Sequence, residues 1–261
     1  MAVEKGKLKN RIAGVGIELE GAWVQQPKFG VIRDGSVDIR VAVPKKFTKQ
    51  PYDLTDADRR KLAAELNEWK RDFEPKYVGE IPSPRLEMDG VQNFMRENYP
   101  KYVNASCGLH VHMSFQYLIN YNRLMTPDFT PFMVKGLLNW AEEEKLAKDH
   151  PLWPRLQKPD HNHCAHIYLG EGQSKITRKE FSSRGTSHSR YTAINYCFAQ
   201  HRTVECRLLS MMDEWEQGYR AVSEVLNITN RFLSKQRSKE LKLQGRVPRT
   251  GIITQERRVY V

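Results

Sequence analysis

The stretch Asn104-Ala-Ser-Cys-Gly-Leu-His-Val-His-Met-Ser114 places two histidines, His110 and His112, on either side of one apolar residue. Side chains alternate between the two faces of a β-strand, so both imidazoles would point to one face and the apolar neighbours to the other. The pattern predicts a strand that presents two histidines to a metal ion or a phosphate group. The alternative is a pair of half-exposed histidines on a solvated sheet, because a His-x-His pattern alone is weak evidence for a bound ligand.

An N-terminal strand, expected within residues 11–24, would supply two carboxylates. Glu18 and Glu20 share one face of this strand with Gly14 and Gly16, whereas the intervening positions are apolar. Two carboxylates about 7 Å apart along a strand repel each other, and a cation between them would relieve the repulsion. The two glycines would leave room for a bulky group on that face. The alternative is the solvated face of an edge strand.

A hairpin is expected to bring in a third strand. Residues 190–196 and 203–209 have the pattern of two paired strands with a turn near residues 199–202. Glu205 and Arg207 lie two positions apart, so they share a face. They could form a simple ion pair. Beside the other polar positions, however, the pair suits a metal-bound anion, with the carboxylate holding the cation and the guanidinium holding a phosphate.

Six short motifs follow one another along residues 11–210. They are Gly14-x-Gly-x-Glu-x-Glu20, Asp34-Gly-Ser36, Gly79-Glu-Ile-x-Ser-Pro84, the 104–114 stretch, Arg190-Tyr-x-x-x-Asn195 and Thr203-Val-Glu-x-Arg207. In this order they resemble the amidoligase family of bacteria and their phages, which belongs to the glutamine synthetase and glutamate–cysteine ligase superfamily. The block Gly-Leu-His-Val-His-Met-Ser is the most specific part of the resemblance.

The resemblance implies an ATP-dependent, ADP-forming carboxylate–amine ligase. In such an enzyme a carboxylate is phosphorylated to an acyl phosphate, and an amine then displaces the phosphate to give an amide. The implied cofactors are ATP and Mg²⁺, with Mn²⁺ as a substitute, and the implied partners are small-molecule or peptide acids and amines. A set dominated by glutamates suits these hard cations better than zinc.

The resemblance also assigns roles to individual positions. The implied metal ligands are Glu18, Glu20, Glu80, His110 and Glu205. The implied nucleotide contacts are His112, Ser114 and Arg207, and His112, Arg207 and Arg190 would be catalytic at the phosphates. The implied substrate contacts are Asn104, Asp34 and Arg190.

The segment His161-Asn-His-Cys-Ala-His166 is a competing signal for zinc. Its spacing fits no common zinc pattern, and no second cysteine pair completes a tetrahedral site. We interpret it as part of a long active-site loop within residues 150–189. Solvated or turn-capping histidines are the alternative.

The helical pattern predicts the rest of the fold. Thr55 begins a capping box before a helix expected to extend to Phe73. A second helix is expected from an N-cap at Thr130 to a stop before Pro151, a third from Asp213, and a weaker one over residues 89–99. These elements predict an α+β domain in which a curved, mostly antiparallel sheet lines the active site and helices cover its outer face. The resemblance implies a glutamine synthetase-like arrangement.

Composition and charge indicate where in the cell the protein is located. The chain has 261 residues and a formal net charge of +11, and no stretch approaches the about 20 apolar residues that cross a membrane. The basic first residues lack a following apolar region, so no signal peptide is expected. Four scattered cysteines indicate buried free thiols in a reducing compartment. We therefore expect a cytoplasmic protein of a bacterium or a phage-infected cell, without a membrane partner.

The C-terminal part of the chain is strongly basic, with nine Lys and Arg against two Glu over residues 231–261. We expect a catalytic domain over residues 1–235 and a basic arm over residues 236–261. This arm could bind nucleic acid, contact an acidic partner, pack on a neighbouring subunit of a homo-oligomer, or remain solvated. Two other functions stay open. One is a metal-dependent nuclease or phosphoesterase acting on nucleic acid, and the other is a non-catalytic nucleic-acid-binding module.

Overall fold

The computed structural model describes residues 11–48, 55–166, 192–197 and 201–243. The strands of this part are β1 (Ile12–Trp23), β2 (Tyr77–Pro82), β3 (Gly108–Phe115), β4 (Ile194–Cys197) and β5 (Thr203–Ser210). The helices are α2 (Lys45–Thr48), α3 (Asp56–Phe73), α4 (Met88–Asn98), α5 (Leu118–Leu124), α6 (Phe129–Glu143), α7 (Leu152–Gln157) and α9 (Trp215–Leu243). The protein is therefore an α+β protein, as the sequence predicts.

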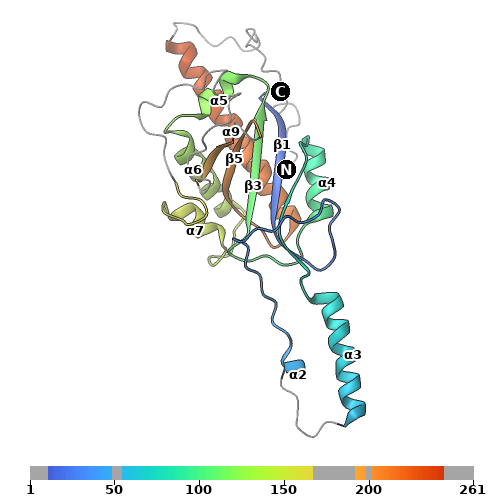
Figure 1. Ribbon diagram of the computed structural model, residues 1–261. Helices are drawn as coiled ribbons and strands as arrows, with labels where there is room; N and C mark the ends of the chain where they lie inside the picture. The colour runs from blue at the N-terminus through green and yellow to red at the C-terminus, as the bar shows by residue number, and fades with distance from the viewer. Residues whose placement is uncertain (1–10, 49–54, 167–191, 198–200, 244–261) are drawn as a thin grey trace.

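The strands form one open sheet in the order β2-β1-β3-β5-β4 (Figure 1), and each strand pairs with its neighbours in the antiparallel direction. The expected hairpin is confirmed as β4 and β5, with Asn195 opposite Glu205. In the centre of the sheet, Glu18 of β1 lies opposite His110 of β3, and His112 lies opposite Glu205 of β5. This register places the central polar residues of three strands next to one another.

The apolar face of the sheet packs on a layer of helices. Figure 1 shows α9 crossing behind the strands, with α4 and α6 on either side of it. The core positions of the central strands, such as Ile17, Val111 and Met113, are fully buried, as are Val222 and Leu226 on α9. Alternation along β1 and β3 therefore works as expected, since one face enters the core and the other carries the glutamates and histidines.

Two helix starts differ from the expected ones. The structure confirms Thr55 as the N-cap of α3, where its hydroxyl accepts a hydrogen bond from the backbone N–H of Asp58. The expectation that Thr130 caps α6 is wrong, because Asp128 is the N-cap and Thr130 lies within the first turn. Pro131 fits there because the first four N–H groups of a helix have no partner within it. The last helix, α9, begins at Trp215, two residues after the expected start.

The boundary drawn between residues 235 and 236 falls inside α9, which continues to Leu243. Residues 236–243 are therefore helical and not an extended arm. Glu240 also ties this part of α9 to the body, because Arg123 of α5 donates to it at 2.8 Å. The remaining residues of the basic arm, 244–261, lie outside the described residues.

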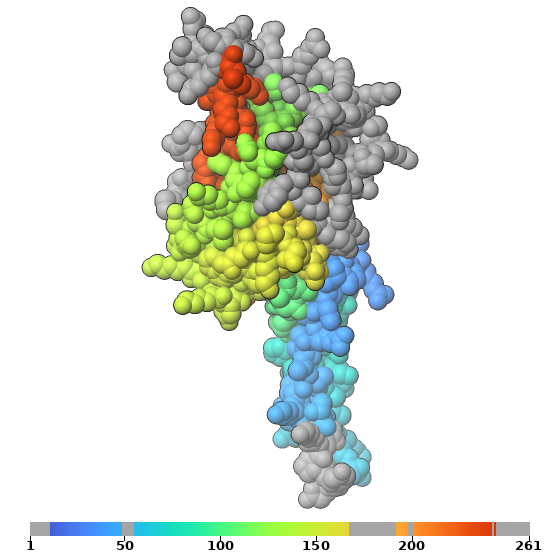
Figure 2. Space-filling model, turned by 90° about the vertical axis from the view of Figure 1, so that its left-hand side faces the viewer, coloured from blue at the N-terminus to red at the C-terminus, as the bar shows by residue number. Residues whose placement is uncertain are grey.

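A helical arm projects from the body between β1 and β2 (Figures 1 and 2). It contains α2 and α3, and α3 has no buried residue over its 18 positions. Trp69 of α3 packs on Phe47 of α2, with ring centroids 6.5 Å apart, and Lys101 Nζ lies 4.7 Å from the ring centroid of Phe73. The helix predicted here is present, but none of its residues belongs to the main core.

Two expectations about the chain's environment can be compared with the structure. All four cysteines are free thiols, as expected, and three of them, Cys107, Cys164 and Cys206, are buried. Among the described residues, no helix combines the length and apolar character needed to cross a membrane.

Apolar side chains of the main core and of the helical arm should contribute differently to the stability of the protein. Replacing Leu109, which is fully buried on β3, by alanine should lower the free energy of unfolding by about 2–5 kcal/mol, because it leaves a cavity in the core. Leu62→Ala on α3 should cost less than half as much, since this side chain is only half-buried. Urea denaturation of the three proteins measures both values. Equal losses would show that the arm belongs to the main cooperative core.

Candidate metal and phosphate site

The polar face of the central strands carries a cluster of carboxylates and imidazoles. His110, which is only 2% exposed, lies at its centre. Its Nδ1 atom is 3.0 Å from Glu18 Oε2 and 3.5 Å from Glu205 Oε1. Its Nε2 atom is 3.4 Å from Glu20 Oε1. One imidazole therefore contacts carboxylates of both neighbouring strands, so Glu18, Glu20, His110 and Glu205 form a single cluster.

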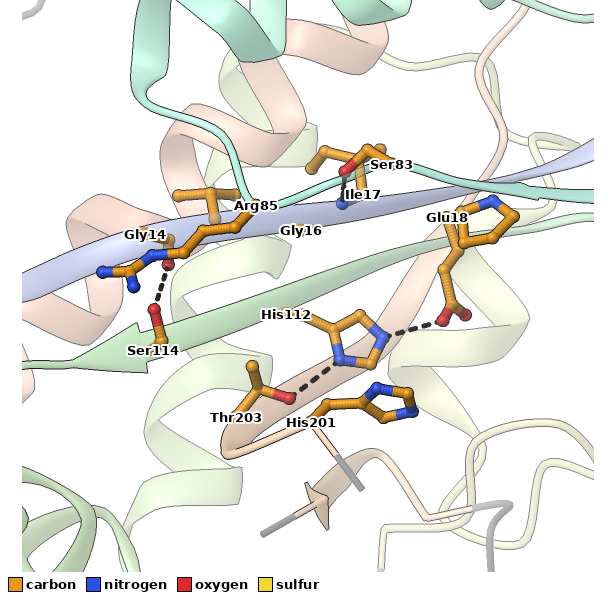
Figure 3. A pocket seen from close by; sticks show the side chains of 12 residues that line it. Gly14, Gly16, Ile17, Glu18, Ser83, Arg85, His112, Ser114, His201 and Thr203 are labelled. Carbon is orange, nitrogen blue, oxygen red and sulfur yellow. Dashed lines mark hydrogen bonds and ion pairs between the residues drawn. The ribbon is translucent and has the colours of Figure 1, made fainter. Parts of the chain in front are cut away.

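The second histidine of β3 lies beside His110 on the same face. His112 Nε2 is 3.0 Å from Glu18 Oε1, and His112 Nδ1 is 3.0 Å from Thr203 Oγ1 (Figure 3). Burial favours the neutral forms of both partners, but their mutual hydrogen bond outweighs it. The pKa of Glu18 is held well below its usual range by His110 and His112, and the pKa of His112 is raised by Glu18 and Glu205.

Glu205 is fixed from two directions. Its carboxylate accepts from Arg207 Nη1 at 2.6 Å and from Asn195 Nδ2 at 3.0 Å. Burial would raise the pKa of Glu205, but the charges of His110 and Arg207 lower it, so the group is ionised. The Nε atom of Arg207 is buried and has no hydrogen-bond partner among the residues that the structure describes. Arg207 therefore keeps a donor beyond its ion pair.

A second group of carboxylates lies on the β2 side of the cluster. One oxygen from each of Glu20, Asp34 and Glu80 lies within 4.8 Å of the others. Glu20 and Glu80 are direct partners in the pairing of β1 with β2. Asp34 arrives from the segment that pairs with the outer edge of β2, where Ile32 and Glu80 exchange backbone hydrogen bonds of 2.8 and 2.9 Å.

Glycine is required at position 79 for this arrangement. Gly79 has a φ of +151°, and a Cβ atom there would overlap the carbonyl oxygen of Ile32. The segment that carries Asp34 can therefore approach β2 only where a side chain is missing. This explains the Gly-Glu pair of the 79–84 motif. The glycine admits the neighbouring backbone, and the glutamate beside it reaches the cluster.

The carboxylates of this second group repel one another. Burial, followed by the charges of Glu18 and Asp34, raises the pKa of Glu80 to about 7. Like charges in a half-buried site stabilise the protonated form of the weakest acid. A divalent cation among these oxygens would remove the repulsion.

The cluster around His110 contains the other group of possible metal ligands, which we call the first group. It consists of one ligand atom each from Glu18, His112 and Glu205, and these atoms lie within 4.8 Å of one another. The two groups divide the ligands differently from the expected set. His112, predicted to contact phosphate, offers a ligand atom to the first group, and Asp34, predicted to contact substrate, belongs to the second. His110 lies between them. The donors are carboxylate oxygens and one imidazole nitrogen, which suit Mg²⁺ or Mn²⁺.

One predicted substrate contact, Asn104, lies outside the cluster, and another cannot be placed. Asn104 is exposed. Its side-chain amide donates a hydrogen bond to Asp38 O at 2.7 Å and accepts one from Ser106 N at 2.9 Å. It therefore shapes the turn before β3 and makes no contact with the cluster. Arg190 lies outside the described residues.

A cavity of about 220 Å³ opens next to the first ligand group (Figure 3). Glu18 lies toward one end, Arg85 and Ser114 lie toward the other, and His112 lies between them. Ser114, a predicted nucleotide contact, lines this cavity, and its hydroxyl donates to Gly14 O at 3.1 Å.

Gly14 and Gly16, expected to leave room for a bulky group, both line this cavity. A Cβ atom on Gly14 would overlap the side chain of Arg85, and one on Gly16 would approach His112 Cβ to 3.2 Å. The protein's own side chains therefore occupy the room that the glycines provide.

Several residues around the cavity and cluster were assigned no role from the sequence, although three of them belong to the quoted motifs. They are Ser83, Arg85, Asn195, His201 and Thr203. The register of the predicted hairpin could have identified Asn195, because it lies opposite Glu205. No periodic pattern identifies Arg85 or His201, since each follows or precedes a strand.

The segment from His161 to His166 forms no group of three metal ligands in the part of the chain that the structure describes. His166 Nε2 is 2.7 Å from the carbonyl oxygen of Arg155, and His161 Nδ1 is 3.6 Å from Cys164 Sγ. Burial and the charge of Arg155 lower the pKa of His161 to about 4. These contacts favour a structural role over zinc binding.

Comparison of the chain with models of known protein families, with curated proteins and with solved structures finds no match. The function is therefore inferred from the sequence motifs and the geometry of the site.

The raised pKa of Glu80 makes a testable prediction about pH. The folded pKa of about 7 exceeds the usual 4.5, so the native state binds more protons than the unfolded state between these values. The contribution of Glu80 to stability therefore falls as pH rises through 7. In metal-free protein, Glu80→Gln should raise Tm relative to wild type at pH 8 and change it little at pH 5.

The matched control is Glu87→Gln, which removes an exposed glutamate outside the cluster. Its effect on Tm should be similar at both pH values. Adding Mg²⁺ at pH 8 should stabilise the wild type more than Glu80→Gln. A Glu80→Gln effect that is the same at pH 5 and pH 8 would contradict the assigned repulsion.

Proposed function

We propose that this protein is an ATP-dependent carboxylate–amine ligase of the amidoligase family, which forms an amide through an acyl phosphate with the help of divalent cations. The observation that carries the proposal is the pair of ligand groups on adjacent strands, one of which borders the cavity. The order of the motifs resembles that of the family, and the two ligand groups bring residues of several motifs together as possible ligands of the cations.

The residues present fit two hard cations. One group contains three carboxylates that repel one another, and the other contains two carboxylates and a histidine. In a ligase, bound Mg²⁺ would neutralise the phosphate oxygens and orient the reacting carboxylate. Phosphoryl transfer depends mainly on such positioning and charge neutralisation, so this type of site suits it.

Other side chains of the site would contact the phosphate groups and hold the cations. Arg207 is held at Glu205, and its Nε–H has no partner among the described residues, so this donor is available to a phosphoryl group bound beside Glu205. His112 lines the cavity, where as a neutral imidazole it can bind the first cation next to the phosphate oxygens. Glu18 and Glu205 have lowered pKa values, so both remain ionised and available as ligands at neutral pH.

A metal-dependent phosphodiesterase is the second candidate. The same two ligand groups would suit an in-line displacement at a phosphodiester, and the net charge of +11 favours a nucleic-acid substrate. The two functions differ in their need for ATP.

The direct test is phosphate release from ATP with Mg²⁺ and a panel of acids and amines. A ligase should release phosphate at an appreciable rate only when a suitable acid and a suitable amine are both present, because the amine displaces the phosphate from the acyl phosphate as the amide forms. Cleavage of DNA or RNA with Mg²⁺ and without ATP would identify the phosphodiesterase. If neither reaction occurs over a broad panel, the enzymatic proposal is overturned.

Arg207→Lys separates a catalytic arginine from a structural one. Lysine keeps the charge next to Glu205, so the fold and metal binding should be retained. It cannot reproduce the planar pair of donors, so phosphoryl transfer should fall on the order of 10²-fold or more. Turnover measured with a working acid and amine pair provides the comparison.

The matched control is Arg220→Lys, which alters a second arginine–glutamate pair, with Glu144 at 3.0 Å, on the surface away from the site. Its turnover should equal that of the wild type. Full activity of Arg207→Lys would reduce Arg207 to a structural ion pair.

A further inference from the structure

Arg85 occupies a position at the cavity that its sequence context does not indicate. It follows β2, and its side chain lies along β1 beside Gly14 (Figure 3). Its Nη2 atom donates to the carbonyl oxygen of Ala13 at 2.9 Å. Within the described residues it makes no ion pair with a carboxylate. The guanidinium is therefore oriented by a backbone carbonyl, and none of the described carboxylates neutralises its charge.

Gly14 is the counterpart of this arrangement. A Cβ atom at this position would overlap Arg85 Nε and approach its Cγ and Cδ atoms. Any larger residue would push the guanidinium away from the strand. The glycine therefore allows Arg85 to lie flat at the edge of the cavity.

His201 provides the opposing wall. It lies at the cavity next to His112, with the two rings arranged edge to face and their centroids 5.7 Å apart. The next residue, Arg202, has a positive φ of 52°, and its carbonyl oxygen accepts a hydrogen bond of 2.8 Å from the buried Tyr121. This contact holds the turn before β5, and with it the backbone next to His201, in a conformation that a non-glycine residue seldom adopts.

The cavity thus has a defined distribution of charge along its length. Glu18 of the first ligand group lies toward one end, and Arg85 toward the other, with His112 and His201 in between. A ligand that spans the cavity would meet a bound cation at the first end and a guanidinium at the second. At about 220 Å³ the cavity is smaller than the about 300–1,000 Å³ of typical small-molecule pockets, so it suits a phosphate chain better than a whole nucleotide.

We propose that Arg85 and His201 form a clamp for the polyphosphate chain of the ligand, with Arg85 binding the phosphate farther from the cation groups. This inference rests on the proposed function, since it assigns the phosphate-recognition residues of the same site. A guanidinium binds phosphate oxygens through parallel, charge-assisted hydrogen bonds, which makes Arg85 the residue that selects a chain of phosphates over a single one.

The test compares the affinities of tripolyphosphate, ADP and inorganic phosphate, each with Mg²⁺, by isothermal titration calorimetry. Arg85→Gln should weaken tripolyphosphate and ADP on the order of 10-fold or more and change the affinity for inorganic phosphate little, because one charge-assisted contact is lost. His201→Gln should weaken the same two ligands to a smaller extent. Arg96→Gln is the matched control, since Arg96 is exposed on α4 and donates only to Asn93 at 3.1 Å.

Gly14→Ala provides a second, independent variant. It should displace Arg85 and weaken tripolyphosphate, and adding Arg85→Gln to it should cause little further loss. Fully additive losses would show that the two residues act separately and would contradict the clamp.

The outcomes distinguish the clamp from the ligase. If the wild type binds MgADP and Arg85→Gln binds it equally well, the clamp is overturned and the ligase proposal stands. If the wild type binds tripolyphosphate through Arg85 but no nucleotide, the clamp stands and the ATP-dependent ligase is overturned. If the wild type binds none of the polyphosphates, both are overturned.

Discussion

The contact of buried His110 with glutamates of two neighbouring strands is the interaction on which the site depends. One imidazole can meet Glu18 and Glu20 on one side and Glu205 on the other only if β1, β3 and β5 keep a single register. A shift of one residue in any of these strands would turn the glutamates into the core and the core residues to the polar face. The apolar layer over α9 opposes such a shift. The core and the polar cluster therefore specify the same register.

The cluster also concentrates negative charge where burial makes it costly. The histidines and Arg207 balance Glu18 and Glu205, which stay ionised, whereas the group on the β2 side is left with repelling carboxylates and a raised pKa at Glu80. A protein that needed only stability would be better served by apolar residues at these positions. The arrangement is reasonable if the missing charge arrives with a ligand. The cavity beside the cluster, lined by His112, His201 and Arg85, then receives the anion that accompanies the cations.

Side-chain alternation made much of this visible in the sequence. It placed Glu18, Glu20, His110 and Glu205 on one face, and it paired the strands that carry Asn195 and Glu205. Alternation could not indicate Asp34, which reaches the cluster because Gly79 admits a neighbouring segment. Nor could it indicate Arg85, whose position depends on a backbone carbonyl and a missing side chain on another strand. The start of α6 was misplaced because Pro131 is tolerated anywhere in the first turn, and the helical pattern that predicted α3 does not indicate that this helix projects from the body.

The central claim is that the two groups of ligands bind two divalent cations. The most direct measurement is a titration of metal-free protein with Mn²⁺, followed by calorimetry and by the loss of the free Mn²⁺ signal in electron paramagnetic resonance. We expect two Mn²⁺ ions per chain in the wild type and one in Glu80→Gln, which removes a ligand from the β2-side group only. Glu205→Gln should weaken the other ion. Absence of Mn²⁺ binding in the wild type, or unchanged binding in both variants, would contradict the assignment of these residues as a metal site.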